Sequence, residues 1–273
     1  MTRRARAWEH VALGARNDLT RQFPNKQLRF YLTAPAACPY LPGLRERKVF
    51  TSLDGPDALA LNEALTHAGF RRSQNIAYRP ACEGCDACMS VRIPVREFAM
   101  RKRWRRVLRR NADLQRTPRP ADATEDQFWL LRRYLNARHG EGGMADMTLL
   151  DYAAMVEETS VRTHIVEYRR KAEGPEHDDL AACALVDVIG DGLSLVYSFY
   201  DTREPARSLG AYVILDHVAQ ALEAGLRYVY LGYWVKGSDK MGYKGDFRPL
   251  EVLRGGAWRR VDDRPEPEDP IET

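Results

Sequence analysis

LVDVIGDGLSLVYSFYDTREPARSLGAYVILDHV, residues 185–218, combines two strand patterns, a tight turn and a helix pattern. Apolar and aromatic runs over 181–189 and 194–200 predict two strands, and Gly190-Asp191-Gly192 between them predicts a hairpin turn. Residues 210–224 place apolar side chains at helical spacing, with Gly225 as the stop, and a further strand is expected over 228–233. The order strand, turn, strand, helix, strand predicts a mixed α+β domain.

The same order of elements is found in the acetyltransferase-like (GNAT-type) acyl-transfer fold, where the N-terminus of the helix after the second strand holds the phosphates of the acyl donor. We therefore predict an α+β protein: a small cysteine-containing N-terminal domain followed by an acetyltransferase-like mixed sheet flanked by helices. The corresponding helix begins at RSLGAY, residues 207–212. A pyrophosphate-binding version needs a small residue where Tyr212 stands, which favours a bulkier donor than coenzyme A.

Patterns outside this stretch predict further elements. Residues 57–68 have helical apolar spacing, and residues 90–95 alternate like a strand. Thr124 with Gln127 resembles a capping box that opens a helix ending near residue 139. A second helix is expected near Thr148 and a strand over 164–168.

The chain divides into four predicted parts. They are a basic cysteine-containing domain (1–100), a basic helix and linker (101–120), an acetyltransferase-like transfer domain (121–260) and an acidic disordered tail (261–273). TPRP, residues 117–120, is the expected joint between the domains. A length of 273 residues suits such a two-domain arrangement.

Charge is distributed unevenly along the chain. Residues 1–119 carry 24 Lys and Arg against 10 Asp and Glu, a net +14, whereas the remainder carries 18 against 28, a net −10. The basic half predicts a polyanionic partner, although separate solvated faces could average out in three dimensions. No apolar run approaches the roughly 18 residues of a membrane helix, and no apolar stretch follows the basic N-terminus as in a secretory signal. We expect a cytoplasmic protein with no membrane partner.

Three cysteines at even spacing, Cys82, Cys85 and Cys88, lie in a segment rich in arginine. Cys-x2-Cys-x2-Cys on a loop brings three sulfurs within reach of one ion, and Cys38 is a candidate fourth ligand. Zinc or an iron–sulfur cluster is therefore a candidate cofactor at these four residues. The alternative is four reduced thiols with no metal. Five cysteines without an export signal argue against a disulfide framework.

RKRWRRVLRRN, residues 101–111, has seven basic side chains in its first ten positions and no acidic one. Trp104, Val107 and Leu108 share one helical stripe, so a helix would bury that edge and expose its guanidinium groups. Such a face suits a phosphate backbone, with RNA as the expected partner. The predicted nucleic-acid-binding residues are Arg101, Lys102, Arg103, Arg105, Arg106, Arg109 and Arg110. The alternative is an ordinary solvated face.

Four motifs resemble the arginyl-tRNA–protein transferase family, and more closely its short bacterial branch: FRRSQNIAYRPAC, SLVYSFYD, SLGAYVILDHV and YVYLGYWVKGSDKMGYK. The resemblance extends from about Gln22 to Trp258. It implies transfer of an aminoacyl group, expected to be leucine from leucyl-tRNA, to the N-terminal amine of proteins that begin with Asp or Glu, which marks them for degradation. The eukaryotic branch is associated with metal or iron–sulfur binding, but its cysteine arrangement differs from the one here. No cofactor is expected to be required for transfer.

The implied reaction suggests roles for particular residues. An acidic acceptor needs a cation, and the candidates are Arg71, Arg72 and Arg79, followed by Lys240 and Lys244. Tyr197, Tyr233 and Trp234 are expected to line an aminoacyl pocket. Asp201 and Tyr233 are the candidate catalytic residues, since Asp201 ends a strand where it could orient or deprotonate the amine. Alternatively, the tyrosines are core residues and Asp201 opens the turn before Pro205.

Three other functions are compatible with the same residues. Arginine is the second candidate for the acyl group, since an arginine pocket would differ from a leucine pocket by a buried carboxylate. A coenzyme A-dependent acetyltransferase and a zinc-bearing RNA-binding adaptor that uses only the basic half are the further alternatives.

Overall fold

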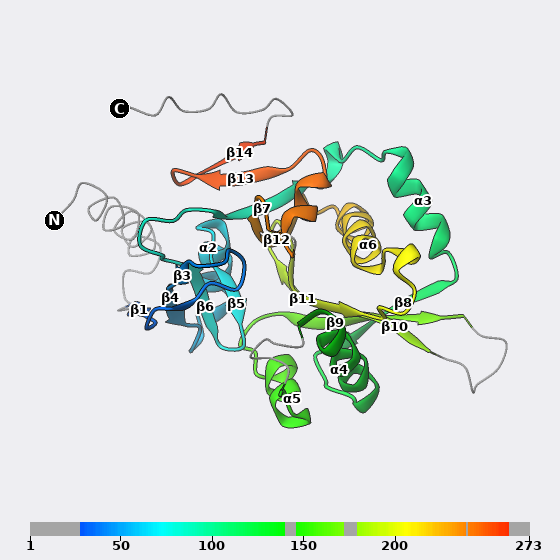
Figure 1. Cartoon of the computed structure of the whole chain (residues 1–273), viewed down its shortest axis with the longest axis horizontal. Coiled ribbons are helices and arrows are strands. Elements are labelled where there is room, and N and C mark those ends of the chain that lie inside the picture. Colours follow the sequence, from blue (N-terminus) through cyan, green and yellow to red (C-terminus); the bar gives the residue numbers. More distant parts are fainter. Residues whose placement is uncertain (1–27, 140–145, 172–178, 239, 262–273) are drawn as a thin grey trace.

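A computed structural model describes residues 28–139, 146–171, 179–238 and 240–261. It shows a mixed α+β protein in which helices cover both faces of a large sheet and a smaller sheet packs at one side (Figure 1). None of the described helices is both long and apolar enough to cross a membrane. The predicted acidic tail lies outside the described residues, apart from Val261.

The large sheet has eight strands in the order β14-β13-β7-β12-β11-β10-β9-β8. These are β7 (Cys88–Pro94), β8 (Leu114–Pro120), β9 (Thr163–Arg170), β10 (Leu180–Ile189), β11 (Gly192–Tyr200), β12 (Tyr228–Val235), β13 (Glu251–Arg254) and β14 (Ala257–Arg260). Among the described strands, β11 and β12 are the one parallel pair, and every other pairing is antiparallel. The predicted hairpin is therefore β10–β11, and the predicted helix after it returns the chain to form β12.

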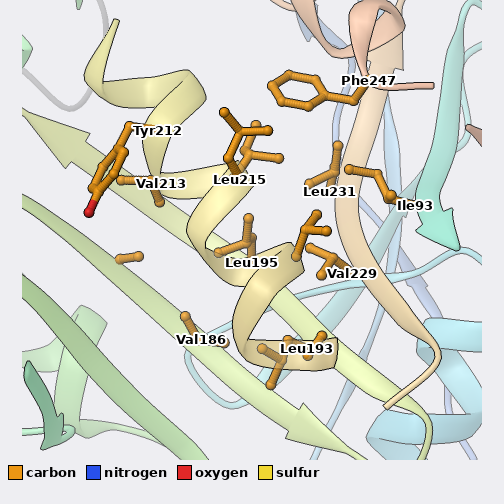
Figure 2. Close-up of a cluster of buried hydrophobic side chains, with 14 of the residues drawn as sticks. Ile93, Val186, Leu193, Leu195, Tyr212, Val213, Leu215, Val229, Leu231 and Phe247 are labelled. Atoms are coloured by element: carbon orange, nitrogen blue, oxygen red, sulfur yellow. The ribbon is translucent and has the colours of Figure 1, made fainter. Parts of the chain in front are cut away.

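Two helices cover each face of this sheet. α6 (Leu209–Glu223) and α3 (Lys102–Arg110) enclose one apolar core, whereas α4 (Glu125–His139) and α5 (Leu149–Glu157) enclose the other. Figure 2 shows the first core, where Val213 and Leu215 of α6 face Leu195 of β11 and Leu231 of β12. The predicted apolar stripes thus point inward, which is what places α6 across the sheet.

Helix starts follow local capping signals. The predicted box before α4 is formed, because the Gln127 N–H donates to the Thr124 hydroxyl at 3.3 Å and the Thr124 N–H donates to the Gln127 side chain at 3.1 Å. Thr148 and Asp151 form a second box at α5. Such caps satisfy N–H groups that a helix start otherwise leaves unpaired, a contribution of about 1 kcal/mol.

The smaller sheet has the strand order β1-β4-β6-β5. It comprises β1 (Tyr31–Leu32), β4 (Lys48–Ser52), β5 (Arg71–Ser73) and β6 (Ile76–Pro80); a two-stranded ribbon, β2 (Ala36–Ala37) with β3 (Arg45–Glu46), accompanies it. α2 (Ala58–His67) covers it with Leu61 and Leu65, as residues 57–68 predicted. Short 3₁₀ helices η1 (Val95–Glu97), η2 (Pro205–Arg207) and η3 (Gly242–Asp246) complete the description.

The structure corrects the predicted joint at residues 117–120, within the expected helix and linker of residues 101–120. Residues 117–120 belong to β8, which pairs with β9 over its whole length. Pro118 and Pro120 suggested a joint, but β8 is an edge strand, where the missing proline N–H groups need no ladder partner. The large sheet also crosses the predicted boundary at residue 100, because β7 pairs with β12 and β13.

Candidate active site

The parallel strands β11 and β12 separate after a short paired stretch. Their pairing runs from Gly192–Tyr228 to Ser194–Tyr230, whereas the strands continue to Tyr200 and Val235 (Figure 1). Each has a register shift just beyond the paired stretch. Val196 is the extra residue of β11 against β10, and Leu231 is the extra residue of β12 against β7. Because bulges bend strands and interrupt their ladders, they open a gap between the two strands, here called the strand split.

Two basic side chains bind backbone carbonyls on the two sides of the strand split. Arg71 Nη2 donates to the carbonyl oxygens of Leu195 at 2.9 Å and Val196 at 2.5 Å. Lys244 Nζ donates to the carbonyl oxygens of Leu231 and Tyr233, both at 2.8 Å. Arg71 comes from β5 of the smaller sheet and Lys244 from η3, so distant segments meet here. Neither side chain contacts a carboxylate among the described residues.

Gly232 allows this arrangement. Its backbone has φ of +70°, and a Cβ placed on it would lie 2.3 Å from Arg71 Cζ. Any side chain at this position would therefore strike the guanidinium, which lies directly against the β12 backbone. Lys244 is bound to the residues on either side of this glycine. Burial, followed by the neighbouring Arg71 charge, lowers the pKa of Lys244 well below its ordinary value.

Tyr233 and Trp234 support the site rather than line it. The Tyr233 hydroxyl is buried and donates to the carbonyl oxygens of Gly69 at 3.1 Å and Tyr78 at 3.0 Å, and burial raises its pKa well above the usual range. A hydroxyl held in this way is a poor proton donor or acceptor for a substrate. Trp234 Nε1 donates to the Gly242 carbonyl at 3.2 Å and so fixes the segment that carries Lys244.

Tyrosines that the sequence analysis missed gather near the end of β11. Tyr200 packs edge-on against Tyr134 of α4 with centroids 5.0 Å apart, and Arg138 donates to its hydroxyl at 3.4 Å. Tyr243 of η3 is 45% exposed. Tyr197, which was predicted, is half-buried, and burial raises its pKa to about 12. No sequence spacing connects these residues, because they come from three elements.

Asp201 does not lie free at the strand split. Its buried carboxylate accepts from Arg203 Nη2 at 2.7 Å and from Arg170 Nη2 at 3.5 Å. Although burial alone would raise the pKa of Asp201, hydrogen bonds from Arg203 outweigh it and lower the pKa to about 2. Such a weak base does not deprotonate an amine at neutral pH. The predicted catalytic role therefore lacks support from this geometry, and the alternative structural role fits it.

The other predicted acceptor-reading cations are occupied or remote. Arg72 forms a buried bidentate ion pair with Asp187, with both distances 2.7 Å. Arg79 donates to the Ala68 carbonyl at 3.3 Å and lies over the Phe70 ring, and burial lowers its pKa. Lys240 is exposed on the loop after β12. Of the five, the structure brings Arg71 and Lys244 together.

α3 has the two faces that its sequence predicted. Trp104 and Val107 are buried, and Trp104 stacks on Phe247 with centroids 4.5 Å apart. All seven predicted basic side chains are exposed. Arg103 pairs with Asp246 at 3.3 Å and Arg110 donates to the Ala206 carbonyl at 2.7 Å. The others, Arg101, Lys102, Arg105, Arg106 and Arg109, have no side-chain partner among the described residues.

The four predicted metal-ligating cysteines line one cavity of about 50 Å³. Burial, and then the nearby Cys82, Cys38 and Cys85, raise the pKa of the Cys88 thiol to about 12. In the described part of the chain, no three His, Cys, Asp or Glu side chains are close enough together to hold one metal ion. Tyr233 also lines this cavity, and its ring centroid lies 6.0 Å from Arg71 Cζ, so this residue connects the thiols with the strand split.

Comparison of the sequence with known proteins identifies the family of the chain. Residues 36–106 match the family model described as arginine-tRNA-protein transferase, N terminus, and residues 126–254 match its C-terminus counterpart. The chain is 59% identical over 240 residues to the aspartate/glutamate leucyltransferase of Caulobacter vibrioides, covering 88% of this chain and 86% of the relative. It is 59% identical over 246 residues to that of Phenylobacterium zucineum, covering 90% and 96%. The chain belongs to the arginine-tRNA-protein transferase family.

Proposed function

We propose that this enzyme transfers leucine from leucyl-tRNA to the N-terminal amine of proteins that begin with Asp or Glu. The names of relatives that match it over most of both chains support the reaction. The structural observation that carries it is the strand split, where β11 and β12 are unpaired beyond Ser194 and Tyr230 and where we place the ester and the amine. In the cytoplasm, such a transfer would mark acceptors for degradation through the N-end rule pathway.

The chemistry is aminolysis of an activated ester. The acceptor amine attacks the leucyl carbonyl, a C–N bond forms, and the C–O bond to the tRNA ribose breaks, with a proton passing from the amine to the departing hydroxyl oxygen. An α-amine has a pKa near 7.7–8.0, so roughly a tenth or more is already neutral at pH 7. Holding both reactants in place can therefore supply most of the rate, up to about 7–11 kcal/mol in favourable geometries.

Backbone N–H groups at the strand split are the candidate oxyanion donors. A bulge leaves its extra residue out of the ladder, and Val196 and Leu231 are the extra residues on the two sides. Arg71 and Lys244 bind the carbonyls at these bulges, which helps to keep the strands apart. Parallel strands that separate and expose backbone N–H groups suit an acetyltransferase-like sheet. We propose that the transfer domain has a fold of that type.

Leucine rather than arginine is favoured by the buried acids. An arginine pocket needs an available buried carboxylate, and the buried acidic residues of the described chain are Glu167, Asp187 and Asp201. Each is paired with arginine: Glu167 with Arg169, Asp187 with Arg72 and Asp201 with Arg203. Each of these three carboxylates is therefore already paired with an arginine of this chain, so none is available for an arginyl side chain of a substrate.

We assign tRNA binding to the exposed face of α3. Its unpartnered arginines lie on one helix that is anchored by Trp104, and like charges so close together favour a polyanion as the counter-charge. The basic cysteine-containing N-terminal part then completes both the tRNA face and, through Arg71, the transfer site.

The cysteines are proposed to hold zinc or an iron–sulfur cluster. The four thiols line one cavity and are the donor type that zinc and iron–sulfur clusters take, and they would have to draw closer together than they are here to bind one ion. A bound metal would replace thiol protons and stabilise the loop behind Tyr233. Zinc, iron and sulfide analysis of anaerobically purified protein tests this. Finding none of them would leave four free thiols.

A two-tRNA transfer assay tests the proposed function. The protein is incubated with labelled leucyl-tRNA or arginyl-tRNA and a peptide beginning with Asp; the same peptide with an acetylated N-terminus is the control. We expect label on the free peptide from leucyl-tRNA and none on the acetylated one. Label from arginyl-tRNA alone would overturn the leucine assignment, and label from neither would overturn the transfer reaction.

A further inference from the structure

Recognition of an acidic first residue requires a cation that is accessible and not already neutralised. Arg72 fails this requirement because Asp187 compensates its charge inside the protein. Arg79 donates to the carbonyl of Ala68, the C-cap residue of α2, and lies over the Phe70 ring, so its donors are not directed to the strand split. Lys240 is solvated, and an exposed ammonium with no fixed partner discriminates weakly between acceptors.

Arg71 meets the requirement. It is half-buried at the strand split, and its Nη2 binds two carbonyl oxygens. Its guanidinium lies 6.0 Å from the Tyr233 ring centroid, and its Nε and Nη1 have no hydrogen-bond or ion-pair partner among the described residues. Carbonyl oxygens orient a guanidinium but do not neutralise it. Arginine stays charged in proteins, and a carboxylate is the ligand that its planar donors match best. The fixed orientation also lowers the entropy lost when a ligand binds.

Lys244 cannot take the same role as readily. Two of its N–H groups are committed to the Leu231 and Tyr233 carbonyls, and the side chain is 6% exposed. Its contacts hold the β12 side of the strand split in place, opposite the carbonyls that Arg71 holds on β11.

We infer that Arg71 binds the side-chain carboxylate of the acceptor's first residue and that Lys244 is a positioning residue for the opposite strand. This inference rests on the proposed function. An Asp or Glu carboxylate supplies the counter-charge that Arg71 lacks, whereas the amide of Asn or Gln leaves the buried charge uncompensated. With Nη2 tied to the strand, the acceptor's amine is directed toward the same gap that receives the ester.

The test compares wild type, Arg71→Gln and Arg71→Lys with peptides that begin with Asp or Asn. Loss of a charged hydrogen bond predicts an increase of about 10- to 100-fold in KM for the Asp peptide in Arg71→Gln. Because Arg71 also holds the β11 side of the strand split, transfer to the Asn peptide is expected to fall as well, but less than transfer to the Asp peptide, so the readout is the ratio of Asp to Asn transfer. Arg71→Lys should recover part of that preference for Asp. Arg132→Gln is the matched control, because Arg132 of α4 also donates to a backbone carbonyl, that of Met147 just before α5.

The outcomes are distinguishable. If wild type transfers leucine and Arg71→Gln keeps the same ratio of Asp to Asn transfer, Arg71 does not bind the carboxylate of the acceptor's first residue. If Arg71→Gln is too unstable to assay, the Asp-to-Asn ratio of Arg71→Lys decides alone, and an unchanged ratio overturns the inference. If wild type transfers nothing from leucyl-tRNA, the proposed function itself fails.

Discussion

The Asp201 carboxylate lies between two arginines, and this pairing decides what the group can do. Its folded pKa of about 2 is below the ordinary aspartate value of 3.8, so the carboxylate is ionised throughout the pH range in which an enzyme of this kind works. The contribution to stability is present above about pH 4 and is lost as the pH falls through 2. Because Arg203 is largely exposed, solvent screening reduces the contribution to the order of 1–2 kcal/mol.

We therefore predict that Asp201→Asn lowers the free energy of unfolding by that amount at pH 7 and leaves the shape of the pH–rate profile unchanged. Urea denaturation at pH 7 and near pH 2 checks the first part, since the difference from wild type should shrink in acid. Transfer rates between about pH 6 and 9 check the second. Loss of a titration step from that profile would restore Asp201 as a base.

Lys244 leads to a second prediction at the scale of single residues. Lys244→Met keeps an unbranched side chain of similar length but leaves the Leu231 and Tyr233 carbonyls without their donor. An unsatisfied buried group lowers the free energy of unfolding by about 1–3 kcal/mol. We expect lower stability and loss of transfer with leucyl-tRNA binding retained. Urea denaturation, filter binding and the transfer assay measure the three.

The difference in stability between wild type and Lys244→Met should depend on pH, and the Lys244 pKa sets its direction. The folded pKa of Lys244 is below the unfolded value of 10.5, so the unfolded state binds its proton first as the pH falls. The wild-type advantage over Lys244→Met should therefore shrink as the pH decreases from about 10.5. An advantage that grows on acidification would mean that the ammonium is stabilised, not penalised, in the folded protein.

α3 is the element whose function depends on its surface. Reversing Arg105, Arg106 and Arg109 to Glu leaves the buried Trp104 edge intact, so the helix should persist while tRNA affinity falls. The slope of log affinity against log salt should decrease by about 0.7–0.9 for each lost phosphate contact. Three exposed arginines away from α3 give a matched triple reversal: Arg45 on β3, Arg162 just before β9 and Arg259 on β14. Equal losses in both triples would assign the effect to net charge rather than to α3.

Elements with strong local signals were predictable from sequence, and those defined by their partners were not. α4 and α6 have capping or glycine stops and inward stripes, and β10–β11 has a turn between two apolar runs, so their patterns suffice. β8 was predicted to be a linker because its prolines are tolerated only through its edge position. The hairpin β13–β14 was missed, although Gly255-Gly256 at its turn is a recognisable signal.

In the candidate active site, too, residue types could be predicted from sequence, but their partners could not. Sequence analysis named Arg71 and Lys244, because basic residues in those motifs suit an acidic acceptor. It did not separate them from Arg72 or Asp201, because the deciding partners are far away in the chain: Arg71 meets Leu195 across 124 positions and Arg72 meets Asp187 across 115. The bulges that open the strand split also have no sequence signal of their own, since they arise from register with neighbouring strands.

The whole molecule unites the two sheets through buried polar contacts. β5 supplies Arg71 to the strand split and Arg72 to Asp187 of β10. Tyr233 of β12 donates to the carbonyl of Tyr78 on β6 of the smaller sheet. β7, from the same part of the chain as the smaller sheet, lies inside the large one. Separate domains joined by a linker would not share strands in this way, so we expect the two sheets to be coupled in stability.

That coupling gives the last prediction. Arg72→Met should lower the stability of the whole protein by about 3–5 kcal/mol, because it leaves the Asp187 charge buried and unpaired, whereas Arg72→Met with Asp187→Leu should recover most of the loss. Urea denaturation followed by far-UV circular dichroism and tryptophan fluorescence should show one coincident transition in every variant. Two separate transitions in wild type, with only one shifted by Arg72→Met, would instead support independent domains. A single transition would mean that the two sheets unfold as one unit. Arg71 on the smaller sheet would then be held in a fixed position at a site built mainly from the large sheet.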